Sequence, residues 1–412
     1  MSINLKKTIK IINFVPEILP SYRPDVDVLY LKELPRQDIV ATVVGLPKDK
    51  RIITKEKGYE LLTSRKTFNR HLDSLVYFFY AIKLAFQTKK NGFDLIQVRD
   101  MVWVGLFCLL AAKVKKVPFT YWVSFLYAES RSSRAKDSNE NIPRWKRPLL
   151  LAQGLAEEFI LYRFILPHSD RIYVQSDFMF NYMKGKGITS KSMMVVPMGV
   201  DFDKIEVSLQ TAPKYIQQWQ GSIVVGYLGS LDRLRKLETI IHAFKQAQEK
   251  IPNLKLLFVG DSEIIQDRQD LQEEVQKLGI ADDFIITGWV STEEAWAYLK
   301  GVDMVIGFMN RGLLLDVSTP TKAMEYMALK KAMICNDSPD QLYVIEQSNC
   351  GRITDGSSES YANAMIDLAQ HPMSEQELDA GYNYIKNNRS YLYLGQQVAN
   401  DIKNILNKHN TL

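Results

Sequence analysis

Residues 223–247 read IVVGYLGSLDRLRKLETIIHAFKQA, and this stretch holds the unit from which the fold can be argued. Its first six residues are rich in β-branched and aromatic side chains, which predicts a buried strand. Glycine and serine follow at 229 and 230, and an amphipathic helical pattern runs from 237 to 247. A strand that leads through glycine into a helix is typical of α/β proteins with a parallel sheet.

The same alternation of strand and helix runs through both halves of the chain. In the C-terminal half we expect further strands at 254–259, 284–287, 304–306 and 332–335, with helices that begin near Lys236, Gln266, Thr292 and Pro320. In the N-terminal half we expect strands at 9–15, 39–45, 94–98, 119–123, 171–176 and 193–197. Strands that alternate with helices predict parallel sheets covered on both faces.

The length of 412 residues exceeds one ordinary core and suits two domains of about 200 residues each. Because 197–203 reads as a linker, we expect an N-terminal domain over 1–200 and a C-terminal domain over 201–380. Helices over 381–412 are expected to cross back to the first domain. The expected fold is two doubly wound, Rossmann-like α/β domains that face each other across a cleft, with ligands beyond the carboxyl ends of the strands.

Composition places the chain among folded proteins. Hydrophobic residues make up 46% and charged residues 24%, which excludes disordered and collagen-like chains. No apolar run reaches the roughly 18 residues of a membrane span, and no signal-peptide stretch follows Met1. The cysteines, Cys108, Cys335 and Cys350, fit reduced thiols and not a zinc site. We therefore expect a cytoplasmic protein.

Charge is divided unevenly along the chain. Residues 1–200 hold 32 Lys and Arg against 18 Asp and Glu, whereas the remaining residues hold 20 against 29. Basic and aromatic residues stand beside apolar helices at 144–162 and 103–116, which suits peripheral contact with an anionic membrane at the inner face of the plasma membrane. The alternative is a solvated basic surface with both helices facing the core. No zinc-finger, RNP or helix-turn-helix pattern is present, so nucleic acid is not an expected partner.

A strong chemical signal is the segment STPTKAMEYMA at 318–328. Thr319 is a good helix N-cap and Pro320 suits the first helical position, so a helix N-terminus with free backbone N–H groups is expected. Lys322 adds a full charge in the first turn, and Glu325 shares its face of the helix. This arrangement suits a nucleoside diphosphate, with the diphosphate at the helix end and the ribose on the carboxylate. The alternative is an ordinary capped helix with an exposed ion pair.

A second anion-binding element follows the strand at 223–228. Glycine at a strand end lets the backbone approach a ligand closely, and three basic residues come soon after it. Two such elements in one domain are more specific than either alone. The residues concerned are Gly229, Ser230, Arg233, Arg235 and Lys236.

Taken together, these motifs resemble glycosyltransferase family 4. The resemblance rests on 229–230 with 235–236, FVGD at 258–261, TGWV at 287–290, the segment at 318–328 and the linker at 196–201. It covers 170–400 well and is diffuse across 1–170. It implies a retaining enzyme of GT-B fold that takes a nucleotide-diphospho-sugar as donor substrate and needs no metal cofactor. The alternative is a metal-dependent enzyme. A divalent metal would then be bound by the aspartate pair at 25 and 27 or by the pair at 201 and 203.

The resemblance also implies roles for individual residues. Lys322 and Arg235 (or Lys236) hold the diphosphate, Glu325 the ribose, and Trp289 with Val290 the base. Further candidates on the donor side are Gly229, Ser230, Arg233, Gly260, Asp316, Ser318, Thr319 and Thr321. Candidates on the acceptor side are Arg99, Asp100, Trp122 and Ser124.

Two positions depart from the family pattern. The first glutamate of the family, eight positions before the second, is here Val317, with Asp316 beside it. The histidine that often follows the strand at 119–123 is here Ser124. We expect a retaining glycosyltransferase that uses a lipid-linked or polysaccharide acceptor in surface glycan biosynthesis (capsule, exopolysaccharide or lipopolysaccharide). The alternatives are a nucleotide-sugar isomerase or epimerase of similar fold, and a non-catalytic nucleotide-sugar-binding subunit.

Overall fold

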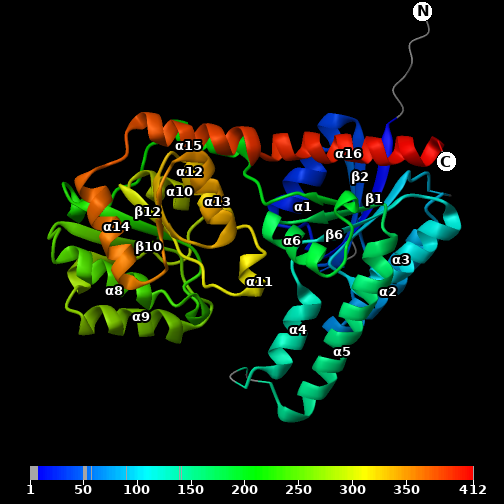
Figure 1. Ribbon diagram of the computed structural model, residues 1–412, viewed down its shortest axis with the longest axis horizontal. Helices are drawn as coiled ribbons and strands as arrows, with labels where there is room; N and C mark the ends of the chain where they lie inside the picture. Colours follow the sequence, from blue (N-terminus) through cyan, green and yellow to red (C-terminus); the bar gives the residue numbers. More distant parts are fainter. Residues whose placement is uncertain are drawn as a thin grey trace, which may run out of the picture. The chain divides into compact units, whose positions relative to one another are not determined.

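The computed structural model describes residues 8–49, 53–56, 58–89, 91–138, 140 and 142–411, which form two compact units (Figure 1). Unit 1 comprises Met1–Pro197 together with Tyr391–Leu412, and unit 2 comprises Met198–Ser390. The helix α16 (Tyr391–Thr411) thus belongs to unit 1, although it follows unit 2 in the sequence.

Within the described residues, unit 1 is built on an eight-stranded sheet of order β3-β4-β2-β1-β5-β6-β7-β8. The edge pair β3–β4 is antiparallel, and the other neighbours are parallel. The central strand β1 is buried along its apolar run because helices cover both of its faces. The strands are β1 (Ile9–Leu19), β2 (Ile39–Pro47), β3 (Ile53–Glu56), β4 (Tyr59–Thr63), β5 (Leu95–Arg99), β6 (Phe119–Val123), β7 (Arg171–Val174) and β8 (Met193–Val195).

The helices of unit 1 lie on two faces of this sheet. Right-handed crossovers that advance from β4 to β8 place α2, α3, α5 and α6 on one face. The other face is covered by α1 and α16, where Leu394, Val398 and Ile402 pack against Ile11 and Val43. The helices are α1 (Pro24–Val28), α2 (Arg70–Phe86), α3 (Val102–Lys115), α4 (Tyr127–Lys136), α5 (Arg147–Ile160) and α6 (Asp177–Gly185), besides α16.

Unit 2 is a doubly wound domain. Its sheet has the order β11-β10-β9-β12-β13-β14 and is parallel throughout the described residues. The strands are β9 (Ile223–Leu228), β10 (Leu254–Val259), β11 (Phe284–Ile286), β12 (Met304–Gly307), β13 (Ala332–Asn336) and β14 (Arg352–Thr354). The strand order reverses between β9 and β12, and ligands of open parallel sheets bind at such a switch point.

Helices cover both faces of the sheet of unit 2, and an apolar core lies on each side. One core contains side chains of α10 and α12, and the other contains side chains of α8 and α14. The helices are α7 (Phe202–Gln210), α8 (Glu238–Gln248), α9 (Ile265–Lys277), α10 (Thr292–Lys300), α11 (Leu313–Asp316), α12 (Thr321–Ala328), α13 (Pro339–Ser348), α14 (Ser358–Gln370) and α15 (Glu375–Asn388).

The structure confirms the expected class of two α/β domains with Rossmann-like cores. The strands expected at 223–228 and 254–259 agree to the residue with β9 and β10. The strands β3 and β4, at one end of the sheet of unit 1, and the edge strand β14 of unit 2 were not expected from the sequence. Across the described residues, no helix combines the length and the apolar character needed to cross a membrane.

Candidate functional site

A lysine and a glycine meet at the carboxyl end of β9 in unit 2. The ammonium group of Lys322 lies so close to the backbone of Gly229 that a Cβ atom at position 229 would collide with Nζ. Gly229 also has a φ of +155°, a backbone angle that residues other than glycine rarely adopt. Nζ lies 5.3 Å from the ring centroid of Tyr227, on the same strand. Glycine at 229 is therefore a condition for the position of Lys322.

The helix α12 is fixed to β9 by its tyrosine. The hydroxyl of Tyr326 accepts a hydrogen bond from the backbone N–H of Leu228 at 2.9 Å. This contact sets the register of the helix against the strand, so that Lys322, one turn earlier, meets Gly229. The position of the lysine thus follows from a side chain that is itself completely buried.

The start of α12 differs from the prediction. Pro320, and not Thr319, is the N-cap residue, and no side chain caps the helix there. Thr319 is buried, and Thr321 is the first helical residue. An uncapped first turn is what an anion site at a helix N-terminus requires, because the backbone N–H groups must remain available to the ligand.

Lys322 and Glu325 are both partly buried, so they are not the exposed ion pair of the alternative interpretation. Burial lowers the pKa of Lys322 to about 8, with a further decrease from Arg235, against the opposing effects of Glu325 and Asp232. Burial raises the pKa of Glu325 to about 7, offset in part by the Trp296 indole and by Lys322. A poorly solvated ammonium group gains strongly from a bound anion, so the pair fits a phosphorylated ligand.

The second glycine of the site joins β9 to β10 and β11. Gly260 has a φ of +139°, and a Cβ atom there would collide with the carbonyl oxygen of Gly229. Its N–H donates to Oγ1 of Thr287 at 3.2 Å, and it forms an isolated bridge with Gly288. The glycine motifs at 229, 260 and 288 therefore lie side by side.

The base-side candidates follow Gly288 in the loop before α10. The ring of Trp289 is 61% exposed. Val290 is partly buried and packs against the core. Trp289 thus offers an apolar surface within a few residues of the joined strand ends, which suits stacking by a base.

The basic residues after β9 have different surroundings. Asp232 accepts hydrogen bonds from Oγ of Ser230 at 2.7 Å and from Nε of Arg235 at 3.4 Å. Arg235 also acts on the pKa of Lys322, so these two charges share one region. Arg233 and Lys236 are exposed. Of the three basic candidates, Arg235 is the one that the structure brings to the lysine.

In the loop after β12, an arginine forms an ion pair with the candidate carboxylate Asp316. Asp316 is buried and accepts from Nε of Arg311 at 2.8 Å. The same guanidinium contacts Asp337 at 2.6 Å. Val317 is completely buried, and Oγ of Ser318 donates to the carbonyl of Leu315 at 2.6 Å. Asp316 is therefore held by an arginine in this structure.

In unit 1, three of the four acceptor-side candidates form one cluster at the carboxyl ends of β5 and β6. The buried guanidinium of Arg99 contacts Asp25 at 2.5 Å, Asp100 at 3.3 Å and Oγ of Ser124 at 3.3 Å. The backbone N–H of Ser124 donates to Asp100 at 2.7 Å. Glu17, at the end of β1, lies 3.9 Å from Arg99. We call these five residues the Arg99 cluster.

The pKa values of the three carboxyl groups in the Arg99 cluster are not shifted in the same direction. Burial raises the pKa values of Glu17 and Asp100 above their ordinary range, although Arg99 opposes the shift. Burial alone would also raise the pKa of Asp25, but Arg99 and Arg23 outweigh it and hold that pKa below its ordinary value. The cluster therefore contains carboxyl groups whose pKa values are shifted in opposite directions by burial and by the two arginines.

Trp122, the fourth acceptor-side candidate, is a core residue packed among aromatic rings. Its ring is buried between Tyr30 and Tyr173, with centroids 6.0 and 5.5 Å away. The guanidinium carbon of Arg99 lies 5.9 Å from the Trp122 ring centroid. Trp122 thus supports Arg99 from the core. Glu17 and Asp25 were not identified as cluster members from the sequence. Glu17 lies beyond the strand expected at 9–15, and Asp25 was considered only as half of a metal-binding pair.

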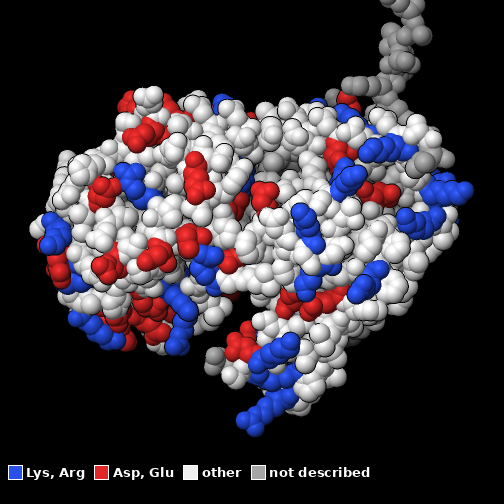
Figure 2. Space-filling view, viewed as in Figure 1, with Lys and Arg blue, Asp and Glu red and all other residues white. Residues whose placement is uncertain are grey.

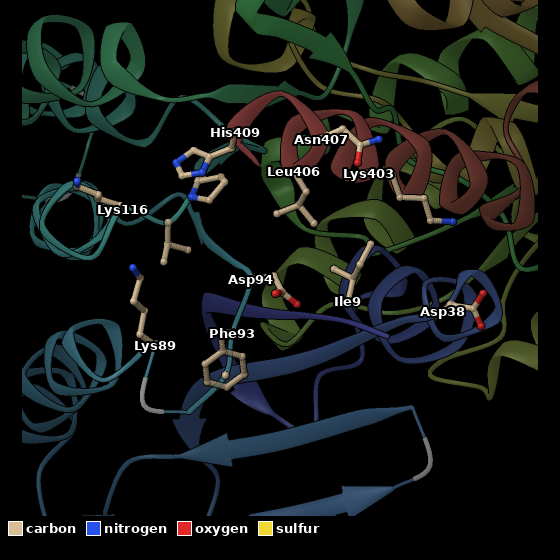
Figure 3. Close-up of a pocket in the computed structure, with 13 residues that line it drawn as sticks. Ile9, Asp38, Lys89, Phe93, Asp94, Lys116, Lys403, Leu406, Asn407 and His409 are labelled. Carbon is tan, nitrogen blue, oxygen red and sulfur yellow. The ribbon is translucent and has the colours of Figure 1, made fainter. Parts of the chain in front are cut away.

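Two hollows lie away from these residues. A pocket of about 790 Å³ opens at the amino ends of the strands of unit 1, with Lys89, Asp94, Lys116 and His409 among its lining residues (Figure 3). A second pocket, of about 620 Å³, is lined in part by Trp219 and lies at the amino end of β9 in unit 2. Ligands of parallel sheets bind at the opposite, carboxyl ends of the strands, so neither pocket coincides with the candidate site.

Two family models match this chain, one in each half. Residues 213–387 match the model described as glycosyl transferases group 1, and residues 29–204 match that of glycosyltransferase family 4. The chain carries two glycosyltransferase domains. The group 1 domain contains Gly229, Lys322 and Glu325. The family 4 domain contains Arg99, Asp100 and Ser124.

One curated relative is an uncharacterized glycosyltransferase of Methanocaldococcus jannaschii, 27% identical over 143 residues. The match covers 33% of this chain and spans about a third, 34%, of that protein.

Several solved structures share the fold over nearly the whole chain. Anabaena HepE in complex with UDP has 13% identity and a TM-score of 0.67, covering 96% of this chain and 100% of that one. A UDP-forming trehalose-phosphate synthase of Burkholderia xenovorans has 13% identity and a TM-score of 0.70, with 97% and 99% covered. Sucrose-phosphate synthase of Thermosynechococcus elongatus has 14% identity and a TM-score of 0.69, with 97% and 100% covered. The GT-B-like fold is thereby confirmed.

Proposed function

We propose that this protein transfers a sugar, with retention of configuration, from a nucleotide-diphospho-sugar to a glycan or lipid-linked acceptor. The observation that carries the proposal is the Lys322 ammonium group, held over Gly229 with its pKa lowered to about 8. A partly buried, poorly solvated cation beside an uncapped helix N-terminus matches a diphosphate. Three solved complexes of HepE support the nucleotide part, since they contain UDP, UDP with glucose, and UDP-glucose.

In the proposed complex, Lys322 and Arg235 bind the diphosphate and Glu325 accepts hydrogen bonds from the ribose hydroxyls. Gly229 and Gly260 let the backbone approach the phosphates, with Ser230 and Thr321 as neighbouring donors. The exposed ring of Trp289 stacks on the base.

We propose that the leaving diphosphate itself serves as the base. The bond between the anomeric carbon and the diphosphate oxygen breaks, the acceptor oxygen bonds to the same face of that carbon, and the acceptor proton passes to the departing oxygen. Negative charge accumulates on the diphosphate, and Lys322 and Arg235 stabilise it. Fixed donors of this kind contribute more than donors in water because the site does not need to reorganise.

The proposed acceptor is a lipid-linked sugar or a growing surface polysaccharide, bound near Arg99, Asp100 and Ser124. The support is the position of these residues at the carboxyl ends of β5 and β6, where parallel sheets bind ligands. Solved relatives in fold include sucrose-phosphate and trehalose-phosphate synthases. Sugar phosphates are therefore the acceptors to compare with glycan and lipid-linked acceptors in an assay of sugar transfer.

The test is a thermal-shift screen with UDP, GDP, ADP, CMP and dTDP, with and without magnesium. A ligand at 100 times its Kd adds about 2.7 kcal/mol to stability, which raises Tm by several degrees. We expect a selective shift that is lost in Lys322→Ala and Glu325→Ala. Lys277→Ala is the matched control, because Lys277 is an exposed lysine of the same unit. Absence of a shift with every nucleotide would contradict the proposal.

A second candidate, a nucleotide-sugar-binding subunit without turnover, is favoured by one observation. Asp316 is held by Arg311, and the neighbouring Val317 is completely buried. Neither residue then presents a free carboxylate to the donor sugar. Tight donor binding with no transfer to any acceptor and no hydrolysis would favour this candidate over the transferase.

A further inference from the structure

Three helices of unit 1 expose large apolar side chains on their outward sides. On α2, Phe79 is 61% exposed; on α3, Val114 is 68% exposed; on α5, Phe159 is 60% exposed. Such side chains normally lie in a core, so a group of them at the surface indicates an interaction site. We call the group the apolar face; its members are Leu72, Leu75, Phe79, Phe86, Trp103, Leu110, Val114, Leu155 and Phe159.

The orientation of α2 is fixed, so its apolar residues cannot turn inward. The buried side of this helix carries Asp73, Tyr77, Ala81 and Ala85, spaced four residues apart. The hydroxyl of Tyr77 lies 3.0 Å from two backbone carbonyl oxygens, of β1 and β2, which ties the helix to the sheet. The opposite side therefore faces away from the sheet and carries leucine and phenylalanine where water would favour polar residues.

The apolar face is continuous across the three helices, which lie side by side in Figure 1. Between α2 and α3, the rings of Phe78 and Phe107 meet edge to face with centroids 5.5 Å apart. Between α3 and α5, Nε1 of Trp103 donates to Glu157 at 3.2 Å. The exposed apolar side chains thus form one surface and are not three unrelated stripes.

The acidic residues of these helices are bound to other groups. Their sequences contain only Asp73, Glu157 and Glu158. Asp73 is buried and paired with Lys66 at 2.9 Å. Glu157 is buried and paired with Arg131, and Glu158 accepts from Oγ of Ser132 at 2.8 Å.

Basic residues surround the apolar face instead. Exposed basic side chains stand on or next to its helices at Arg70, Lys83, Lys113, Arg144 and Lys146. Trp145, 68% exposed, lies among them, with Nζ of Lys146 over its ring at 5.1 Å. Figure 2 shows uncharged surface over much of α5, with Lys and Arg at the lower end of unit 1 and Asp or Glu side chains beside them.

We propose that the apolar face binds the surface of a bilayer that contains anionic phospholipid. Apolar side chains inserted at the headgroup boundary and basic side chains on the phosphates match the two layers of such a surface. A second copy of this chain would bring two positive margins together, which electrostatic repulsion disfavours. The proposal concerns unit 1 alone and does not depend on the donor chemistry of unit 2.

The experiment is flotation of the full chain with phosphatidylcholine vesicles, with or without about a third of phosphatidylglycerol. We expect binding to the anionic vesicles at low salt and weaker binding at high salt, because salt screens the headgroup charge. Lys83→Gln with Lys113→Gln should weaken binding by roughly five-fold for each residue. Leu75→Gln with Phe79→Gln and Val114→Gln should weaken it by about ten-fold or more.

The matched control is Ile264→Gln with Ile265→Gln, two exposed isoleucines of unit 2 at 61% and 74% exposure, which should leave flotation unchanged. The thermal shift with the nucleotide that the screen selects should persist in the triple variant, which separates this proposal from the donor proposal. Failure of the wild-type chain to float with anionic vesicles, or equal loss in the control, overturns the inference. So does a concentration-dependent dimer in light scattering that the triple variant abolishes, since a second copy would then occupy the surface.

Discussion

At the scale of single residues, the candidate site depends on one contact between a lysine and a backbone. Lys322 can occupy its position because Gly229 has no side chain, and its ammonium group is poorly solvated there. Under the proposed function, the site is thus arranged for an anion before the anion binds. Such preorganisation lets a few groups have large effects on rate.

Removal of the lysine should therefore affect catalysis far more than folding. We expect Lys322→Ala to reduce the transfer rate by about 100-fold or more, the usual cost of removing one preorganised donor. Activity within a few-fold of wild type would exclude the role. Gly229→Ala should lower the rate in the same range, and the double variant should be no worse than either single one, because both remove the same contact.

Under the proposed function, the two pKa values predict a bell-shaped pH dependence for binding of the nucleoside diphosphate that the thermal-shift screen selects. Glu325, with a pKa raised to about 7, must be ionised to accept from the ribose, so affinity should rise as pH increases through about 7. Lys322, with a pKa lowered to about 8, loses its charge as pH increases, so affinity should fall above about 8. Calorimetric titration across pH 6 to 10 measures both limbs. Lys322→Arg should remove the alkaline limb alone, because arginine remains charged.

At the scale of elements, the Arg99 cluster joins strand ends that are distant in sequence. The guanidinium of Arg99, the last residue of β5, contacts Asp25 of α1 and the residues that directly follow β5 and β6. Arg99→Met should destabilise the protein by about 3–5 kcal/mol, because buried carboxylates lose their partner. Arg134→Met, which breaks an exposed pair with Glu140, should cost less than about 1 kcal/mol. Similar losses of Tm in both variants would contradict this account.

Several elements were predictable because their sequence patterns are local. The strands β9 and β10 are continuous apolar runs, as expected where both faces are buried. The edge strand β3 is short and polar, so it has no detectable pattern. The start of α12 was misplaced by one residue, because Thr319 and Pro320 both suit a helix boundary.

The site was predictable in part for the same reason. Lys322 and Glu325 stand in a local helix-end motif, so the sequence identifies them together. The partnership of Asp25 with Arg99 joins positions 74 residues apart, and no local pattern reports it.

At the scale of the whole molecule, unit 1 is completed by a helix encoded after unit 2. Leu394, Val398 and Ile402 of α16 are buried against the sheet of unit 1, and Asp401 accepts from Arg171 at 2.6 and 2.8 Å. Truncation after Ser390 should remove several buried apolar side chains, each worth about 1.5–3 kcal/mol, which approaches the total stability of a domain. We expect rapid proteolysis within 8–197 and persistence of 198–390. A truncated chain with wild-type Tm would contradict this.

The late position of α16 also has a consequence during translation. The whole of Met198–Ser390 must be synthesised before α16 exists, which takes on the order of 10–40 s at about 5–20 residues per second. During that interval the nascent sheet of unit 1 lacks one of its covering helices, whereas unit 2 can close on a continuous segment. The second unit is thus able to reach its native state first, whereas the apolar surface that α16 covers in unit 1 stays exposed until translation ends.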